Sequence, residues 1–230
     1  MSDSTLYRLM SWLSPSFPVG AYTHSCGLEW ATAEGLVTGL AELISWVGDI
    51  LAIGSGRSDA VLFVHAYRAS VERDQARLLE IAELAAALHP SCERRYEAIA
   101  QGAAFRRIAL ATASCAALNM VAEIPDDGLC YPIAVALLAQ GHGVGLSPAL
   151  TAYLHALVSN LVSAAQRLIP LGQTDGQKAI AALEPTVNRL VDSAIARSDE
   201  DPFEALGTAT LMVDFASLAH ETQYTRLFRT

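Results

Sequence analysis

The sequence predicts an all-α protein, built as a single-domain compact helical bundle of about ten helices. Three observations support this fold class. Alanine is abundant, no segment alternates apolar and polar residues as a half-buried strand would, and Gly and Pro residues fall between stretches with helical spacing. Because the sequence contains no repeat, linker or low-complexity segment, we expect one domain over residues 1–230, with an irregular N-terminal loop and a C-terminal tail at 217–230.

Apolar spacing predicts three helices in the first part of the chain. Residues 5–13 carry leucines on one face, and the two prolines and the glycine of residues 14–20 then form an irregular loop. Ser25 is the expected N-cap of a short helix that stops at Gly35. The third helix, residues 40–51, has the clearest apolar stripe, made of Leu40, Leu43, Ile44, Val47, Ile50 and Leu51.

Three longer helical segments follow. The Gly-Ser-Gly segment 54–56 ends the preceding helix, and we expect Ser58 or Asp59 to start the next one. That helix is apolar on all sides in its first turns, which predicts a central position. A helix at 74–88 stops before a proline, and a long helix at 91–120 begins with a serine cap.

Turn residues and proline define the middle of the second half. Residues 125–128 (PDDG) predict a turn, and residues 132–140 predict a short helix. A strong helix is expected at 147–168, with Ser147 as N-cap and Pro148 as its first residue.

The remaining segments are expected to be a loop and three helices. Residues 170–177 have the composition of a loop. Two helices follow, divided or kinked near Pro185. Asp201 and Pro202 are the expected start of the last helix, at 203–216.

The composition excludes one class of partner and favours another. A net charge of -9, with Lys178 as the single lysine, leaves no cationic cluster to neutralise phosphates, so we expect no nucleic-acid binding. Hydrophobic residues make up 52% of the chain and charged residues only 17%. Such a composition predicts that extra apolar surface is covered in an oligomer or a complex.

The cysteines, the N-terminal residues and the longest apolar run indicate where in the cell the protein is expected. Cys26, Cys92, Cys115 and Cys130 are far apart and form no C-x-x-C, so neither a zinc knuckle nor a redox pair is predicted. The first residues lack the basic and apolar regions of a signal peptide. The longest apolar run, 146–168, contains several polar residues, which is typical of a buried helix rather than a membrane span. We therefore expect a cytoplasmic protein without a membrane partner.

None of the glycine-rich segments has the pattern of a catalytic motif. Residues 54–57 lack the lysine and the spacing of a phosphate-binding loop, and residues 141–145 follow no predicted strand. Residues 172–177 have turn chemistry but no nucleophile beside a base. We therefore expect neither an enzyme nor a bound cofactor.

Two histidines have polar neighbours that raise the question of a metal or acid–base site. His24 and Cys26 lie two residues apart beside Glu29, but two candidate ligands without a third at a fixed spacing do not predict a metal site. A loop histidine and a small buried cysteine are the simpler interpretation. His220 precedes Glu221, but adjacent residues do not face each other on a helix, so no acid–base pair is predicted.

The last eleven residues, 220–230 (HETQYTRLFRT), are unusual for a chain end. Two arginines minus one glutamate give this segment a charge of +1, and it carries two aromatic residues. Aromatic residues and arginine are enriched at the centres of protein interfaces. Two interpretations are equally open: the segment docks on a partner, or it packs as a cap on its own domain. Arg226 and Arg229 would hold the tail in place or, alternatively, reach a nucleotide bound by a partner.

Three segments together resemble the UreF family of urease accessory proteins. They are residues 14–29 (SPSFPVGAYTHSCGLE), residues 168–173 (LIPLGQ) followed by Gly176 and Gln177, and residues 220–230. Their order and spacing, and the chain length, are similar to those of the family from end to end.

The resemblance implies an all-helical, dimeric, non-enzymatic protein. Members of the family bridge UreD (also called UreH) and the GTPase UreG. The complex engages apo-urease and supports GTP-dependent delivery of nickel to the carbamylated-lysine site. The flexible ends of these proteins become ordered on binding UreD, which agrees with the interface-like composition of the tail.

The resemblance also implies a set of partner-binding residues and no catalytic ones. The set comprises Pro18, Gly20, Tyr22, Gly27, Glu29, Gln173, Gln177, His220, Glu221, Tyr224, Arg226, Phe228 and Arg229. The chain departs from the family pattern at Cys26, Tyr131, Leu218-Ala219 and Thr230. We therefore carry over no metal role to Cys26 or Tyr131.

Three alternative functions can be distinguished from that of a scaffold. The first is activation of the GTPase by Arg226 or Arg229 in trans, which an Arg-to-Lys change would abolish without loss of binding. The second is a nickel-binding chaperone that uses His24, Cys26 and other histidines. The third is a small helical enzyme, for which the sequence offers no convergent acid–base set.

Overall fold

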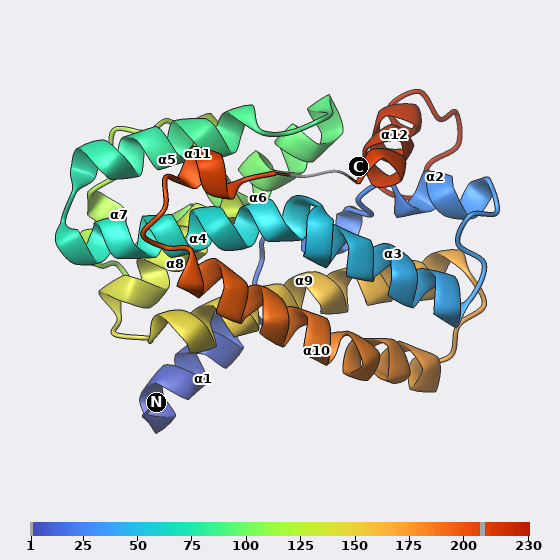
Figure 1. The fold of residues 1–230 in the computed structure, drawn as a ribbon, viewed down its shortest axis with the longest axis horizontal. Coiled ribbons are helices and arrows are strands. Elements are labelled where there is room, and N and C mark those ends of the chain that lie inside the picture. Colours follow the sequence, from blue (N-terminus) through green and yellow to red (C-terminus); the bar gives the residue numbers. More distant parts are fainter. Residues whose placement is uncertain (1, 208–209) are drawn as a thin grey trace.

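The computed structural model describes residues 2–207 and 210–230 and confirms the all-α fold class (Figure 1). Within these residues the chain forms helices and no strand. In chain order the elements are α1 (Asp3–Trp12), η1 (Ala21–Thr23), α2 (Leu28–Ala33), α3 (Leu40–Ile53), α4 (Ser55–Glu72), α5 (Gln75–Ala87), α6 (Cys92–Thr112), α7 (Ala116–Asn119), η2 (Asp126–Gly128), α8 (Tyr131–Gly141), α9 (Leu146–Leu168), α10 (Gln173–Ala196), α11 (Pro202–Ala205) and α12 (Leu211–His220), where η marks a 3-10 helix.

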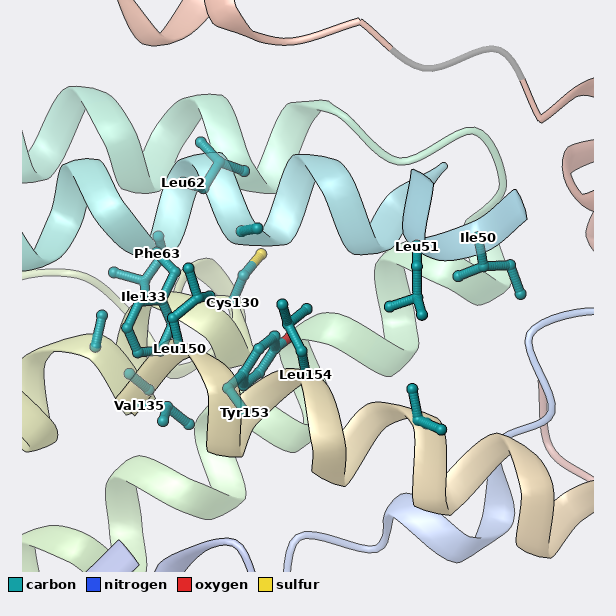
Figure 2. Close-up of a cluster of buried hydrophobic side chains, with 14 of the residues drawn as sticks. Ile50, Leu51, Leu62, Phe63, Cys130, Ile133, Val135, Leu150, Tyr153 and Leu154 are labelled. Carbon is teal, nitrogen blue, oxygen red and sulfur yellow. The ribbon is translucent and has the colours of Figure 1, made fainter. Parts of the chain in front are cut away.

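Helix α4 is the centre of the body and packs against α3, α5, α8, α9 and α10 (Figure 1). Its residues Ala60–Val64 are all buried, as the apolar run predicts. Figure 2 shows Phe63 of α4 beside Ile133 of α8 and Leu150 of α9, and none of these three side chains is exposed to solvent. The centre of the core is therefore the all-round apolar part of α4 and α8, onto which the other helices pack one apolar face.

Several predicted helix starts are confirmed by their caps. The side chain of Asp74 accepts a hydrogen bond from Arg77 N at 2.9 Å, and that of Ser91 accepts one from Arg94 N at 3.1 Å. Asp201 caps α11 by accepting from Phe203 N at 2.8 Å. In each case a side-chain oxygen satisfies an N–H that the helix itself leaves unpaired.

Three predicted starts are wrong because glycines take the N-cap positions. Helix α4 begins at Ser55, directly after Gly54, so a single residue separates α3 from α4. A Cβ at Gly54 would lie 2.9 Å from the carbonyl oxygen of Ile50, so this tight connection requires glycine. Helix α9 begins after Gly145 rather than at Ser147. Helix α2 begins after Gly27 and Ser25 lies outside it, although the Ser25 hydroxyl accepts from Glu29 N in the first turn at 3.4 Å.

The predicted loop at 170–177 is confined to residues 170–172, and the predicted division at Pro185 is wrong. Helix α10 starts at Gln173 and is continuous to Ala196, with Pro185 inside it. Gly176 lies against α9, because a Cβ there would be 2.6 Å from Gln166 Nε2. Proline removes one backbone hydrogen bond from a helix. Tertiary packing of one apolar face compensates for that loss, through buried Leu183, Val187, Leu190, Val191 and Ala194.

The predicted helix at 91–120 is divided in the structure. Helix α6 ends at Thr112, and Cys115 is the N-cap of the short α7. The break lets α7 pack against α8 at Gly141, where a Cβ would lie 2.4 Å from Cys115 Sγ. Close approach of the two helices thus depends on the glycine.

The last predicted helix, 203–216, includes residues 208 and 209, which lie outside the described residues. On their N-terminal side only the single turn of α11 forms, and on their C-terminal side α12 extends to His220. Within the described part of the chain, none of the helices combines the length and the apolar character that a membrane crossing requires.

Candidate functional site

The tail, defined here as residues 221–230, folds back onto its own domain, and the chain ends beside α12 (Figure 1). The backbone N–H of Arg229 donates to the Thr23 carbonyl at 2.8 Å. The Phe228 side chain is 3% exposed, and the Arg167 guanidinium lies 4.3 Å from the centre of its ring. Of the two interpretations of the tail, the structure shows packing on its own domain.

A fully buried histidine joins α12 to α2 and α6. His220 is 0% exposed, and its Nε2 lies 3.1 Å from Oε2 of Glu29, on α2. Its Nδ1 lies 2.6 Å from Oε2 of Glu93, on α6. Both ring nitrogens thus lie within hydrogen-bond distance of a carboxylate oxygen. The ring therefore links α12 to two other helices.

The same two carboxylates hold the tail. Oε1 and Oε2 of Glu29 accept hydrogen bonds from the backbone N–H groups of Leu227 and Phe228, at 2.6 and 2.8 Å. Oε1 of Glu93 pairs with the guanidinium of Arg226 at 2.8 Å. Hydrogen bonds to a charged group are stronger than those between neutral groups. We call the following residues the tail clasp: Glu29, Glu93, His220, Glu221 and Arg226.

Glu221 contributes to the clasp through α6 rather than through His220. Its Oε1 accepts hydrogen bonds from the backbone N–H groups of Cys92 and Glu93, at 2.8 and 3.3 Å. A carboxylate at a helix N-terminus satisfies unpaired N–H groups and interacts favourably with the helix dipole. Glu221 and His220 are therefore not an acid–base pair in this structure.

A second polar cluster holds the end of the tail. The carbonyl of Thr230 accepts from Ser25 N at 2.6 Å. The Thr230 hydroxyl lies 2.7 Å from Nδ1 of His24 and donates to Oε2 of Glu97 at 3.3 Å. Glu97 also forms a buried ion pair with Arg94. Buried charges need such partners, so removing any one of them leaves another uncompensated.

The two weak metal candidates take part in this second cluster. Burial lowers the pKa of His24 and raises the pKa of the Cys26 thiol, so both groups favour their neutral forms. Cys26 Sγ lies 4.0 Å from Oε2 of Glu97. Among residues 2–207 and 210–230, no three His, Cys, Asp or Glu side chains are grouped so that they could hold a metal ion. In this structure His24 and Cys26 support the tail.

A cavity of about 460 Å³ lies beneath the N-terminal loop. Loop residues 13–22 line it together with side chains of α4, α6 and α9, among them Asp59 and Glu97. Asp59 accepts a hydrogen bond from the Tyr153 hydroxyl at 2.7 Å, and burial raises the pKa of Asp59 to about 6. Glu97 contacts the tail through Thr230 and also lines the cavity, so it joins the two features.

Exposed aromatic and apolar side chains lie on η1, on the tail and on α12. Tyr224 is fully exposed, and Tyr22 and Leu227 are 68% and 64% exposed. Helix α12 adds four exposed apolar residues on its outer face, which we call the α12 stripe: Leu211, Met212, Phe215 and Leu218. Groups of exposed apolar side chains mark sites of protein–protein contact more often than ordinary surface.

The N-terminal members of the predicted partner-binding set shape the backbone. Pro18 and Gly20 belong to the loop that lines the cavity, and Gly20 has a left-handed φ of +77°. Gly27 also has a left-handed φ, of +76°, and a Cβ there would lie 2.7 Å from the backbone N of Ser217. Only glycine therefore lets α12 pack this close to the start of α2.

Not all predicted residues are brought together, and several contributors were missed. Gln173 and Gln177 are exposed on the first turns of α10, and no hydrogen bond within the described residues links them to the tail. Sequence analysis missed Glu93, Arg94 and Glu97 as site residues. The spacing of residues 94, 97 and 101 places them on one face of the helix, and this was the one feature that could have pointed to the cluster. A polar and charged helix face is usually solvent-exposed, so this spacing did not suggest a buried site.

Comparison with known proteins gives one consistent result. The family described as UreF matches residues 37–184. The chain is 50% identical over 226 residues to the urease accessory protein UreF of Bradyrhizobium sp. (strain ORS 278), covering 98% of this chain and 92% of that protein. It is 49% identical over 227 residues to the urease accessory protein UreF of Rhodopseudomonas palustris (strain TIE-1), covering 99% of this chain and 93% of that protein.

Proposed function

We propose that this chain, which belongs to the UreF family of urease accessory proteins, works in urease maturation as a non-enzymatic scaffold. Membership of the family supports the maturation role. The observation that carries the scaffold proposal is the surface around the tail clasp. It presents exposed Tyr22, Tyr224, Leu227 and the α12 stripe on a frame fixed by charged hydrogen bonds.

The proposed partners are UreD (UreH), the GTPase UreG and apo-urease, in the cytoplasm. We assign the tail and the α12 stripe to the contact with UreD. Two exposed tyrosines and an uncharged apolar stripe have the composition of an interface centre. The low charged content of the chain, 17%, supports a homodimer that covers further apolar surface.

Scaffolding would act through concentration and linkage. A dimer presents two copies of each docking surface and holds two GTPase molecules close together, which raises their effective concentration for pairing. Suppose that the complex binds the GTPase more tightly in one nucleotide state than in the other. Hydrolysis of GTP then changes the affinity between the GTPase and the complex by the ratio of the two affinities. Nickel insertion into urease would then depend on GTP.

Activation of the GTPase by a tail arginine is the rival proposal. The side chain of Arg226 is 39% exposed and bound to Glu93, and the guanidinium of Arg229 lies 5.7 Å from the centre of the Tyr96 ring. Both arginines therefore have partners within the chain, which supports a positioning role. Hydrolysis by the assembled complex with Arg226→Lys or Arg229→Lys separates the proposals, since a finger arginine is not replaced by lysine.

The scaffold proposal is tested by size-exclusion chromatography with light scattering. The chain would be run alone, with UreD, and with UreD and GTP-loaded UreG, and compared with a version that ends at Ala219. We expect a dimer that recruits both partners only with the tail present. Because the shorter version also loses buried His220, the full chain with Tyr224→Ala is the second variant, and Tyr7→Ala on α1 is its exposed aromatic control. A folded monomer that binds neither partner would overturn the proposal.

A further inference from the structure

We propose that the cavity beneath the N-terminal loop binds a small organic cation, which the carboxylate of Asp59 holds. The ligand would carry an ammonium, amidinium or guanidinium group on a compact apolar body. The site does not depend on the proposed function, because every residue that builds it belongs to this chain. The size, the access, the charge and the aromatic lining of the cavity each support such a ligand.

The cavity is large enough for a whole ligand and reaches the surface. Its volume of about 460 Å³ lies within the range of small-molecule sites, which is about 300–1,000 Å³. Loop residues 13–22 and one side of α9 line it, and these include the exposed residues Tyr22, His155 and Ser163. A ligand can therefore enter between the loop and α9. A single side chain of a partner protein would leave much of this volume empty, so the expected occupant is a free small molecule.

The charged groups that line the cavity leave one carboxylate without a counter-charge. They are Asp59, Arg94 and Glu97, with a sum of -1 when the histidines are neutral. Glu97 forms an ion pair with Arg94 and also accepts from Gln101 Nε2 at 3.2 Å and from the Thr230 hydroxyl at 3.3 Å. The guanidinium and one carboxylate therefore compensate each other, and the charge of Asp59 remains.

Asp59 has capacity left for a ligand. Within the described residues it accepts one hydrogen bond, from the Tyr153 hydroxyl to Oδ2 at 2.7 Å, which leaves Oδ1 for a donor in the cavity. Burial raises the pKa of Asp59 to about 6, and Arg94 lowers it by less than burial raises it. A bound cation would replace the water that the carboxylate has lost and would supply the missing charge. The site should therefore select for positive charge.

Aromatic rings line the same cavity. Phe17 comes from the loop, Tyr22 from η1, Tyr131 from the start of α8 and Tyr153 from α9. The rings of Tyr131 and Tyr153 lie 5.6 Å apart, centre to centre. The faces of aromatic rings attract cations, and ammonium ligands are commonly recognised in this way. Rings beside a single free carboxylate suit a cation that also has an apolar part.

The donor groups do not suit a divalent metal ion. Among residues 2–207 and 210–230, no three His, Cys, Asp or Glu side chains are grouped so that they could hold one. One carboxylate with a free oxygen can pair with an ammonium, or with the N–H groups of an amidinium or a guanidinium. We therefore assign an organic rather than an inorganic cation.

The test compares benzamidine, an aromatic cation, with benzamide, its neutral analogue of nearly equal shape. The full isotope-labelled chain is titrated with each compound at about pH 7 and about 0.15 M salt, which screens charges at the surface. Amide NMR shifts of Ser58, Ala60 and Ala156 report occupancy of the cavity. We expect saturable binding, with a dissociation constant for benzamidine about tenfold to a hundredfold lower than for benzamide. Equal affinities, or no saturable binding of benzamidine, would overturn the proposal.

A second arm separates a free molecule from a protein side chain. A blocked tripeptide with a central arginine carries a guanidinium on a peptide backbone. We expect it to bind more weakly than benzamidine, because the cavity lies beneath a loop and its entrance must also accommodate the backbone. Tighter binding of the tripeptide at the same amides would assign the cavity to a protein side chain and overturn the assignment to a small molecule.

Two variants locate the site. Asp59→Asn keeps an acceptor for the Tyr153 hydroxyl but has no charge, so it should bind benzamidine no more tightly than benzamide. Its control is Asp49→Asn, at an exposed position on α3, which should keep the preference for the cation. Ala156→Phe adds a ring at a position that lines the cavity and should abolish binding of both compounds. A preference for benzamidine that survives in folded Asp59→Asn would overturn the role of this carboxylate.

Discussion

The core around α4 and the tail are held to the molecule by different physics. Phe63, Ile133 and Leu150 are completely buried and make contacts that are apolar and non-directional. The tail buries Phe228, but most of its anchors are hydrogen bonds and ion pairs, among them those of Leu227 and Phe228 with Glu29, of Arg226 with Glu93 and of Thr230 with Glu97. Apolar burial changes little with pH, whereas a cluster of titratable groups depends on the charge of every member.

This difference predicts that the tail can open while the body stays folded. Releasing the tail breaks directed hydrogen bonds and ion pairs and exposes little apolar surface beyond one phenylalanine. Opening the core would expose several large side chains at once. We therefore expect mutations in the two regions to separate global stability from local docking. The predictions below are arranged from the largest expected effect to the smallest.

Phe63→Ala should cause the largest loss of stability. The ring is 0% exposed and lies 5.6 Å, centre to centre, from the ring of Tyr153. Removing it leaves a cavity that close-packed helices fill only in part, so we expect a loss of about 3–5 kcal/mol in the free energy of unfolding. Urea denaturation followed by circular dichroism measures this loss. Val71→Ala, at an exposed site on the same helix, should change stability by less than about 0.5 kcal/mol.

Asp59→Asn tests whether the body also responds to pH. Burial raises the pKa of this carboxyl from 3.8 to about 6, so the folded state binds its proton more tightly than the unfolded state. Its contribution to stability is full below the unfolded value and is lost as pH rises to about 6. Asparagine avoids this loss and can still accept from Tyr153. We expect it to raise the free energy of unfolding at pH 7 by up to about 3 kcal/mol.

The control for this prediction is the pH itself. At about pH 3 most of the Asp59 carboxyl is neutral in both states, so the variant and the unmodified chain should differ much less. Urea titrations at the two pH values make the comparison. Equal stability at pH 7 would mean that water in the cavity solvates the ionised carboxylate.

Glu29→Gln should release the tail and leave the body intact. The amide keeps one acceptor oxygen, so one of the Leu227 and Phe228 N–H groups loses its partner, and the His220 ring loses one of its two carboxylates. We expect docking of the tail to weaken by about 1–3 kcal/mol. Trypsin cleavage after Arg226, an arginine held by the clasp, should accelerate by roughly fivefold to a hundredfold, because cleavage needs local opening.

The matched control is Glu34→Gln, an exposed position at the end of α2, which should leave the rate of cleavage unchanged. Urea unfolding of Glu29→Gln should stay close to that of the unmodified chain. A variant whose core melts together with the tail would mean that the clasp belongs to the cooperative unit of the body rather than to a separate one.

Much of the fold could be predicted because apolar spacing dominates it. The stripe at 40–51 and the caps at Asp74 and Ser91 correspond to real helices. The errors occur where glycine or proline has a role that only packing decides. Gly176 and Pro185 look like helix breakers in sequence, yet α10 runs through both because its buried face holds it against α9 and α3.

The candidate site could be predicted only in part, for a related reason. The resemblance pointed to the segments that carry Glu29, His220 and Arg226, and the structure brings these residues together. The partners from α6 were missed because Glu93 and Glu97 look like ordinary surface charges along a helix. Contacts across more than a hundred residues, such as His220 with Glu93, leave no periodic signal in one sequence.

Tyr224→Ala should have the smallest effect on stability and the clearest effect on binding. The side chain is fully exposed and makes no hydrogen bond within the described residues, so the free energy of unfolding should change by less than about 0.5 kcal/mol. An exposed aromatic residue at the centre of an interface contributes about 1–4 kcal/mol to binding, so we expect a clear loss of affinity for UreD. Isothermal titration calorimetry against UreD measures it, with Tyr7→Ala as the control. Unchanged affinity in Tyr224→Ala would place the UreD contact on the α12 stripe alone and would limit the tail to covering α2 and α6.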